Sequence, residues 1–469
     1  MPKKWASPAT ACAGQVLPQC AKTGVQARKA AVIKVLPLPI KKADCTIRLL
    51  PHTKPAWRPP SIPCVISAAC LPRAAPALPL RPVRRLAGLL LALACGLPAH
   101  GAWAAASLAP GLAPLDARLN EQILMLPAGA GGRERLETTL FKPDGPGPFP
   151  LLVINHGKAP GNPRLQRRDR FVYMAAAFVR RGYAVLVPMR TGFANSSGRY
   201  SDFGCNMTAN GYAQAADIAD VLEYASQQSW IDARRIVVAG QSYGGLASMA
   251  LATQDIPGVR GVLNFAGGLR TIGGSCDWQQ ALVQAFADYG RRSRLPSLWL
   301  YGANDSFFAP PLVSRLHQAY TRGGGKAQLL SYGAFKNDAH RMLASRDGEK
   351  IWLPHAERFL QSIGMPFREV YALADTPPAP ASHYAALEDV AALPYVPERG
   401  REQYRAFLKR MTPRAFAISA SGAWGWAEEG EEPEARALAA CQSSSEQPCR
   451  LYSVDERVVW PDASAGRTD

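Results

Sequence analysis

From about residue 120 the chain alternates short apolar runs with longer segments whose apolar positions recur every three or four residues. The short runs have the length of strands, and the longer segments have the spacing of amphipathic helices. The runs are continuous in valine, leucine and isoleucine, as is typical of parallel strands covered on both faces. The pattern therefore predicts a doubly wound, mostly parallel α/β domain over about residues 115–368.

Eight strands are expected in this domain, and the first two should form an opening hairpin. The expected strands are 121–128, 134–143, 150–157, 183–189, 235–240, 259–268, 296–305 and 327–333. Helices are expected at 171–182, 209–228, 243–253, 311–325 and 348–364. In open sheets of this type ligands bind outside the carboxyl ends of the strands. Functional residues should therefore follow strands directly.

Beyond this domain, residues 372–384 are rich in proline and predict a linker. The remaining segment, 385–469, carries a strand pattern at 414–419, a helix pattern at 431–442 and a second strand pattern at 449–460. We expect a small α+β domain there, stapled by a disulfide. Its tryptophans are expected to pack in the core rather than to line a binding surface.

The formal charge of +18 is concentrated in residues 1–104, which carry fifteen Lys and Arg and one acid, leaving about +4 for the rest. No basic stripe with interleaved aromatic residues follows, so we expect no nucleic-acid partner. Residues 1–82 show neither helical nor alternating periodicity. They are expected to be an unstructured leader, or a segment upstream of the true translation start near Val83.

Residues 83–104 have the organisation of a secretory signal peptide. Arg84 and Arg85 precede an apolar stretch, 86–97, and Ala102-Trp103-Ala104 offers small residues for cleavage. The apolar stretch is short for a bilayer span. We expect a periplasmic or secreted protein with no stable membrane span after cleavage. Lipidation at Cys95 is the alternative.

Ten cysteines divide between the leader and the mature chain, and four lie in the mature chain: Cys205, Cys276, Cys441 and Cys449. An even number in an exported protein indicates disulfides. Of the three possible pairings we favour Cys205–Cys276 and Cys441–Cys449. None of these cysteines has a partner at metal-ligand spacing, so we expect no metal and no cofactor.

The candidate nucleophile is Ser242, in the sequence G-Q-S-Y-G between a predicted strand and a predicted helix. A G-x-S-x-G motif in that context places the serine on a sharp turn with its hydroxyl exposed at the sheet edge. The same motif occurs by chance elsewhere, so the serine needs a base and an acid in the order Ser, acid, His.

His340 and Asp305 meet that requirement. His340 lies in an irregular segment after the last strand, whereas His317 and His355 lie within predicted helices. Asp305 lies at the carboxyl end of the expected strand 296–305. Two alternatives remain open: Asp305 caps the next helix, or Asp338 orients His340 in its place.

An acyl-transfer site also needs two backbone N–H groups where negative charge develops, each worth roughly 3 kcal/mol. Tyr243, which follows the nucleophile, should supply one of these groups. Lys158, in the sequence Asn155-His156-Gly157-Lys158 after the third strand, should supply the other. His156 is expected to hold that loop rather than to act as the base.

These motifs resemble the α/β-hydrolase superfamily, and within it the dienelactone-hydrolase-like serine hydrolases. The resemblance rests on N-H-G-K, G-Q-S-Y-G-G, Y-G-A-N-D-S-F and D-A-H, and covers about 115–368. The segment 190–200 is similar to the Arg/Gly-rich loop of these enzymes, which implies substrate contacts by Arg190 and Tyr200. True dienelactone hydrolases have a cysteine nucleophile and are typically cytoplasmic, so the likeness is to exported serine relatives.

The expected activity is cleavage of small or soluble carboxylic esters through an acyl-enzyme. Only about 30 residues separate the sixth and seventh strands, so any lid should be small. A disulfide between Cys205 and Cys276 would pin the loops that roof the site. The alternatives are a peptidase or amidase with the same triad, and a non-catalytic binding protein on the hydrolase fold. No pattern indicates an oligomeric state.

Overall fold

The computed structural model describes residues 114–271, 275–374 and 378–461. The leader 1–82, the signal peptide 83–104 and Cys95 lie outside the described residues. The described chain contains a large mixed sheet covered by helices and, after residue 378, a separate four-stranded antiparallel sheet. Both parts of the predicted fold class are therefore confirmed.

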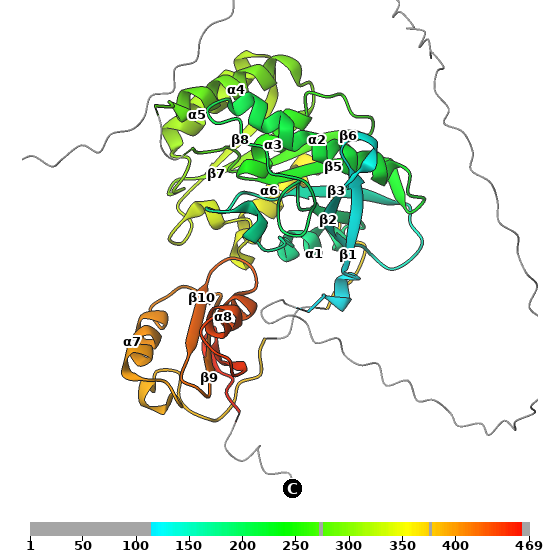
Figure 1. Cartoon of the computed structure of the whole chain (residues 1–469). Helices are drawn as coiled ribbons and strands as arrows, with labels where there is room; N and C mark the ends of the chain where they lie inside the picture. The colour runs from blue at the N-terminus through cyan, green and yellow to red at the C-terminus, as the bar shows by residue number, and fades with distance from the viewer. Residues whose placement is uncertain (1–113, 272–274, 375–377, 462–469) are drawn as a thin grey trace, which may run out of the picture. The chain divides into compact units, whose positions relative to one another are not determined.

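The large sheet has eight strands in the order β1-β2-β4-β3-β5-β6-β7-β8. Its strands are β1 (Gln122–Ala128), β2 (Glu134–Phe141), β3 (Phe149–Asn155), β4 (Ala184–Pro188), β5 (Ile231–Gln241), β6 (Val259–Phe265), β7 (Pro296–Gly302) and β8 (Lys326–Tyr332). The predicted opening hairpin is present, because β1 pairs antiparallel with β2. From β4 to β8 all neighbours are parallel. The carboxyl ends of these six strands therefore lie along one edge of the sheet (Figure 1).

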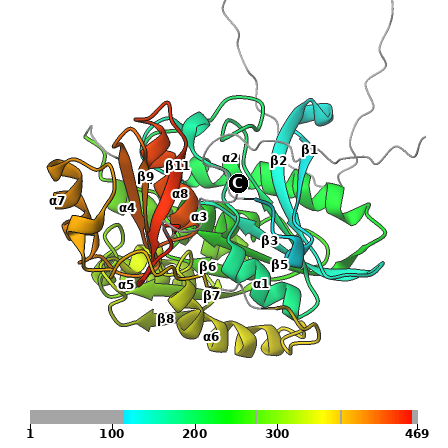
Figure 2. The same cartoon turned by 90° about the horizontal axis from the view of Figure 1, so that it is seen from below.

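Six helices cover the two faces of this sheet. They are α1 (Val172–Arg180), α2 (Met207–Ser226), α3 (Tyr243–Leu251), α4 (Trp278–Arg292), α5 (Pro310–Arg322) and α6 (Glu349–Ser362). Buried side chains of α2 to α5 form one apolar core with the sheet. Those of α1 and α6 form a second core on the other face. Figure 2 shows α1 and α6 on the side opposite α3 and α4.

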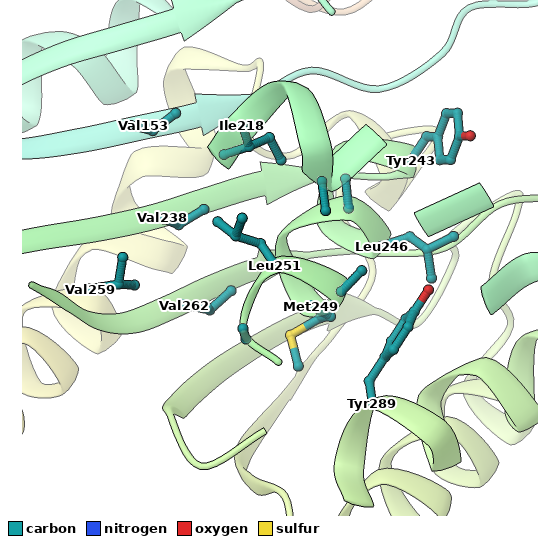
Figure 3. Close-up of a cluster of buried hydrophobic side chains, with 14 of the residues drawn as sticks. Val153, Ile218, Val238, Tyr243, Leu246, Met249, Leu251, Val259, Val262 and Tyr289 are labelled. Atoms are coloured by element: carbon teal, nitrogen blue, oxygen red, sulfur yellow. The ribbon is translucent and has the colours of Figure 1, made fainter. Parts of the chain in front are cut away.

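Burial of whole strands explains the continuous apolar runs of the sequence. All seven residues of β3 and all five of β4 are buried. On the larger core face, Leu246 and Met249 of α3 pack with Val153 and Val238 of the central strands (Figure 3). A side chain of this size contributes roughly 1.5–3 kcal/mol when fully buried. The helix that follows Ser242 is thereby fixed against the sheet.

Helix α4 was not predicted, although its buried residues recur at helical spacing. Leu282, Ala285, Phe286 and Tyr289 point into the core, and the remaining surface is polar. The residues between β6 and β7 thus form a helix on the sheet face, which agrees with the expectation that little chain is left for a lid.

The antiparallel sheet has the order β10-β9-β11-β12. Its elements are α7 (Glu398–Phe407), β9 (Arg414–Ser419), β10 (Trp424–Glu428), α8 (Pro433–Gln442), β11 (Cys449–Val454) and β12 (Arg457–Val458). Helix α7 and strand β10 were not predicted. The tryptophans of this part, Trp424, Trp426 and Trp460, pack against its apolar core. A disulfide joins Cys441 at the end of α8 to Cys449 at the start of β11.

Short 3-10 helices occur at Ala117–Leu119, Ala130–Gly132, Pro163–Leu165, Ala339–Arg341, Arg346–Gly348 and Val390–Ala392. Among the described residues, no helix combines the length and the apolar character that crossing a membrane requires.

Candidate active site

Ser242 occupies a strained turn between β5 and α3. Its backbone has φ 56° and ψ −121°, a conformation that residues other than glycine rarely adopt. Strand β5 ends at Gln241 and helix α3 begins at Tyr243, so the serine is the single residue between them. This is the strand–turn–helix geometry that a nucleophilic serine needs at a sheet edge.

The glycines after Ser242 allow close backbone packing at this turn. A Cβ on Gly244 would overlap the carbonyl oxygen of Asn155 at the end of β3. A Cβ on Gly245 would lie 2.5 Å from Oδ1 of Asn264 in β6. The start of α3 therefore sits directly against the ends of β3 and β6, which lie on either side of β5, and only glycine permits that approach.

The structure brings Asp305 and His340 together. Asp305 follows β7 and His340 follows β8, and the side chains are almost fully buried, with exposed fractions of 7% and 9% for the residues. Nδ1 of His340 lies 3.0 Å from Oδ2 and 3.2 Å from Oδ1 of Asp305. This bond fixes the imidazole with Nε2 directed away from the carboxylate. The sequence order alone could not show this contact.

Asp305 is itself held by the backbone. Its Oδ1 accepts hydrogen bonds from the amides of Phe307 at 2.8 Å and Phe308 at 2.9 Å. Helix α5 begins later, at Pro310, and has no side-chain cap. Asp305 therefore shapes the loop before the helix and does not cap it, while its other oxygen remains with His340.

Asp338, the alternative acid, bonds to the loops and not to the imidazole. Its carboxylate accepts from the Ser306 amide at 3.0 Å, the Ser306 hydroxyl at 2.7 Å and the His340 amide at 3.0 Å. Partial burial acts to raise the pKa of Asp338, but these hydrogen bonds outweigh it and lower the pKa below its usual value. Asp338 thus ties the loop of Asp305 to the turn of His340.

No hydrogen bond joins the side chains of Ser242 and His340 in the described structure. The side-chain amide of Gln241, next to Ser242, donates to the carbonyl of His340 at 2.8 Å. Catalytic hydrogen bonds are often loose without substrate and tighten in the complex. The structure therefore brings Asp305 and His340 into contact and joins the residue before Ser242 to the backbone of His340.

Two free backbone amides flank Ser242. The Tyr243 amide is the first of α3, and neither it nor the Lys158 amide has a hydrogen-bond partner among the described residues. A Cβ placed on Gly157 would lie 3.2 Å from Cβ of Ser242, so the loop that carries Lys158 adjoins the serine. Both donors are thus available to a developing oxyanion.

His156 holds the loop of Lys158. Its Nδ1 donates to the Gly157 carbonyl at 2.6 Å, and its Nε2 accepts from the Arg190 amide at 3.1 Å. Complete burial, together with the charge of Arg190, lowers the pKa of His156 well below its usual value. The imidazole is therefore neutral at physiological pH and serves as both donor and acceptor.

Arg190 lies fully buried behind Tyr243. Its Nε donates to Gln214 at 2.8 Å, and its guanidinium carbon lies 5.5 Å from the centre of the Tyr243 ring. Its two terminal nitrogens have no hydrogen-bond partner among the described residues, and burial lowers the pKa of the guanidinium to about 10. A substrate contact by Arg190 remains a prediction. The guanidinium of Arg190 is fully buried, so a substrate would have to reach a group that has no exposed surface in this structure.

Tyr200 is half-buried and lies beside Tyr243, with ring centres 6.4 Å apart. The ammonium group of Lys158 lies 5.6 Å from the centre of the Tyr200 ring. The disulfide Cys205–Cys276 joins the loop before α2 to the loop before α4. Within the described part of the chain, no group of three or more His, Cys, Asp or Glu side chains could hold a metal ion.

Sequence reasoning missed Phe307, whose ring centre lies 4.4 Å from that of His340. The available signal was its position two residues after the predicted acid. Two adjacent phenylalanines follow Ser306, however, and the sequence does not tell which of them faces the imidazole.

A family model described as X-Pro dipeptidyl-peptidase (S15 family) matches residues 131–290. The matched stretch includes Ser242 and ends before Asp305 and His340. No curated protein matches the chain.

Three solved structures are among those similar to part of the chain. A dienelactone hydrolase described as putative, from Klebsiella pneumoniae, has 17% identity and a TM-score of 0.36, over 52% of this chain and 98% of its own. Est1E from Butyrivibrio proteoclasticus, with ferulic acid bound, has 18% identity and a TM-score of 0.38, over 51% and 99%. The acylaminoacyl peptidase of Pyrococcus horikoshii has 17% identity and a TM-score of 0.41, over 54% and 43%.

The strand order, with an antiparallel start and parallel strands from β4 to β8, is that of a hydrolase sheet. The strained serine between β5 and α3 and the matched family model agree with this assignment. The domain that carries Ser242, Asp305 and His340 therefore has an α/β-hydrolase fold.

Proposed function

We propose that the protein is a serine hydrolase that cleaves carboxylic esters of small or soluble substrates through an acyl-enzyme. The observation that carries the proposal is the buried hydrogen bond between Asp305 and His340, beside a serine on a strained turn. A base oriented by an acid next to an exposed hydroxyl is the arrangement that activates a serine.

In this mechanism His340 removes the proton of Ser242 as the hydroxyl attacks the ester carbonyl. Asp305 stabilises the imidazolium that forms, and the amides of Tyr243 and Lys158 donate to the oxyanion. His340 then protonates the departing alcohol. In the second half, His340 activates a water molecule, which releases the acid and restores Ser242.

A peptidase or amidase with the same residues is the second candidate. The family model that matches residues 131–290 is named for X-Pro dipeptidyl-peptidases, which favours this alternative. Against it, the stretch between β6 and β7 forms helix α4 on the sheet face, which leaves little chain for a lid over the site.

The test is a panel of nitrophenyl esters of increasing acyl length, assayed beside X-Pro nitroanilides. Ser242→Ala should lower kcat/KM on the preferred ester by at least about 10⁴-fold, and Asp305→Asn by a similar order. Equal rates for wild type and Ser242→Ala would refute the mechanism. Faster turnover of nitroanilides than of esters would replace the ester proposal by the peptidase one.

We further propose that the protein is exported. The two disulfides support this, because such bonds persist in oxidising compartments. Fractionation of cells that express the full chain, with mapping of the mature N-terminus, tests this proposal. A mature chain that starts upstream of residue 83 would contradict the predicted signal peptide.

A further inference from the structure

Two consecutive phenylalanines follow the acid loop, and they differ sharply in burial. Phe308 is 1% exposed and belongs to the larger apolar core. Phe307 is 38% exposed, and its ring centre lies 4.4 Å from that of His340, with the two planes 33° apart. Phe307 therefore covers one face of the imidazole while part of its own ring remains open to solvent.

A single exposed apolar side chain needs no special explanation. Phe307 differs from the other exposed apolar residues of this domain because it contacts the proposed base. Its position is also fixed, since its amide donates to Asp305 at 2.8 Å and the neighbouring Ser306 is bound on both amide and hydroxyl by Asp338. The backbone that carries the ring is thus held in place before any substrate binds, and the ring itself packs on His340, which limits the entropy lost on binding.

The leaving group of an ester must pass close to this ring. Nδ1 of His340 is held by Asp305, so Nε2 is the atom that protonates the departing alcohol oxygen. That oxygen must come within about 3 Å of Nε2. The carbon atoms attached to it then lie within van der Waals reach of a ring stacked on the same imidazole.

We propose that Phe307 is a specificity-determining residue that forms the apolar wall of the leaving-group subsite. The substrates are then esters of apolar alcohols, rather than of methanol or other very small alcohols. This inference rests on the proposed function, because it takes His340 as the proton donor to the leaving group.

The test compares acetate esters of methanol, butanol and benzyl alcohol with wild type and Phe307→Ala. Methanol and benzyl alcohol have similar acidities, so differences in rate report contact rather than leaving-group chemistry. A group that covers roughly 50 Å² of the ring gains about tenfold in kcat/KM at the usual value for apolar burial. We expect wild type to prefer benzyl over methyl acetate, and Phe307→Ala to reduce that ratio about tenfold.

Two controls distinguish a role of Phe307 in binding the leaving group from a role in supporting the imidazole of His340. Methyl esters of increasing acyl length should show the same selectivity in wild type and Phe307→Ala, because the acyl group lies on the other side of the scissile bond. Tyr371→Ala removes a ring of similar exposure, 37%, from a residue whose backbone amide donates to the Arg180 carbonyl at the end of α1, at the opposite edge of the sheet. This variant should leave the benzyl-to-methyl ratio unchanged.

An equal loss of rate on methyl and benzyl acetate, or a change in acyl selectivity as large as that in alcohol selectivity, would overturn the inference. If wild type cleaves amides but not esters, the ester proposal fails, and acetamides of methylamine and benzylamine test the same wall. If wild type cleaves neither class, both the proposed function and the inference are refuted.

Discussion

Removal of the Asp338 carboxylate should disturb the active site, although the substitution removes no proposed catalytic group. Asp338 accepts two hydrogen bonds from Ser306 and one from the amide of His340. These bonds join the residue after Asp305 to the turn that carries the base. If they set the separation of Asp305 and His340, Asp338→Ala should reduce catalysis as well as stability.

The magnitude follows from the number and exposure of these bonds. Because Asp338 is half-buried, each bond is worth roughly 0.5–1 kcal/mol net, so the three together contribute about 2 kcal/mol. The turn is not released entirely, since the Tyr332 hydroxyl still donates to the Ala339 carbonyl at 3.0 Å. We therefore expect a shift of the imidazole well below 1 Å and a loss of about tenfold in kcat/KM, less than the 10²-fold expected for a full 1 Å misplacement.

Asp338→Asn separates geometry from charge. An asparagine oxygen can still accept from the two amides, and its NH2 group can donate to the Ser306 hydroxyl. We expect this variant to retain most of the activity that Asp338→Ala loses. The double variant with Ser306→Ala should be no slower than Asp338→Ala alone, because both changes remove the same link.

The assay is ester hydrolysis per folded molecule, measured beside urea unfolding. Asp232→Ala is the matched control, since Asp232 accepts from the Arg234 amide at 3.1 Å and from Arg235 at 2.7 Å at the amino end of β5. It should lower stability without lowering kcat/KM. The reasoning is refuted if Asp338→Ala loses about 2 kcal/mol of stability and keeps wild-type kcat/KM.

Further predictions concern the turn, the buried imidazole and the disulfide. Gly244→Ala gains about 1 kcal/mol of helix propensity, but the added methyl group overlaps the Asn155 carbonyl. We therefore expect the free energy of unfolding to fall by about 1–2 kcal/mol, and an unchanged Tm in thermal unfolding would contradict the packing. The pKa of His156 is lowered in the folded state, so below about pH 6.5 the unfolded chain gains a proton that the folded chain excludes, and the unfolding free energy falls by up to about 1.4 kcal/mol per pH unit. His156→Asn should lose that slope in urea unfolding between pH 7 and pH 5, and parallel slopes would disprove it. Replacing both Cys205 and Cys276 by serine should lower the free energy of unfolding by about 4 kcal/mol, because the disulfide closes a loop of 71 residues. Equal unfolding midpoints for the variant and the wild type would show that the disulfide does not stabilise the fold.

The sheet was predictable because its strands are buried over their whole length. Every residue of β3 and β4 is buried, and such runs have no competing interpretation when helical patterns separate them. Helix α4 was equally readable from Leu282, Phe286 and Tyr289, but its polar remainder obscured the pattern. Helix α7 and the five-residue strand β10 were missed because few of their residues are buried.

The candidate site divides in a similar way. The order of Ser242, Asp305 and His340 could be inferred because each follows a strand whose carboxyl end lies on one edge. The sequence favours Asp305 over Asp338 as the acid, because two residues from His340 is an awkward separation for orienting its ring, but it does not establish that choice. The choice depends on side-chain directions that two separate loops set together.

Asp305 and Asp338 make different contacts, one with the imidazole of His340 and the other with the two loops, and this difference has a physical reason. Asp305 needs one oxygen free for His340, so its other oxygen takes the amides of Phe307 and Phe308 and fixes the carboxylate from its own loop. That arrangement fixes Asp305 but does not fix the imidazole, which belongs to a different loop. Asn304 already joins the loop after β7 to Phe335 and Lys336 in the loop after β8, and Asp338 adds a link at the turn of His340 by accepting from both loops at once. The base and its orienting acid follow different strands, so their separation depends on these links between the two loops as well as on the hydrogen bond between Asp305 and His340.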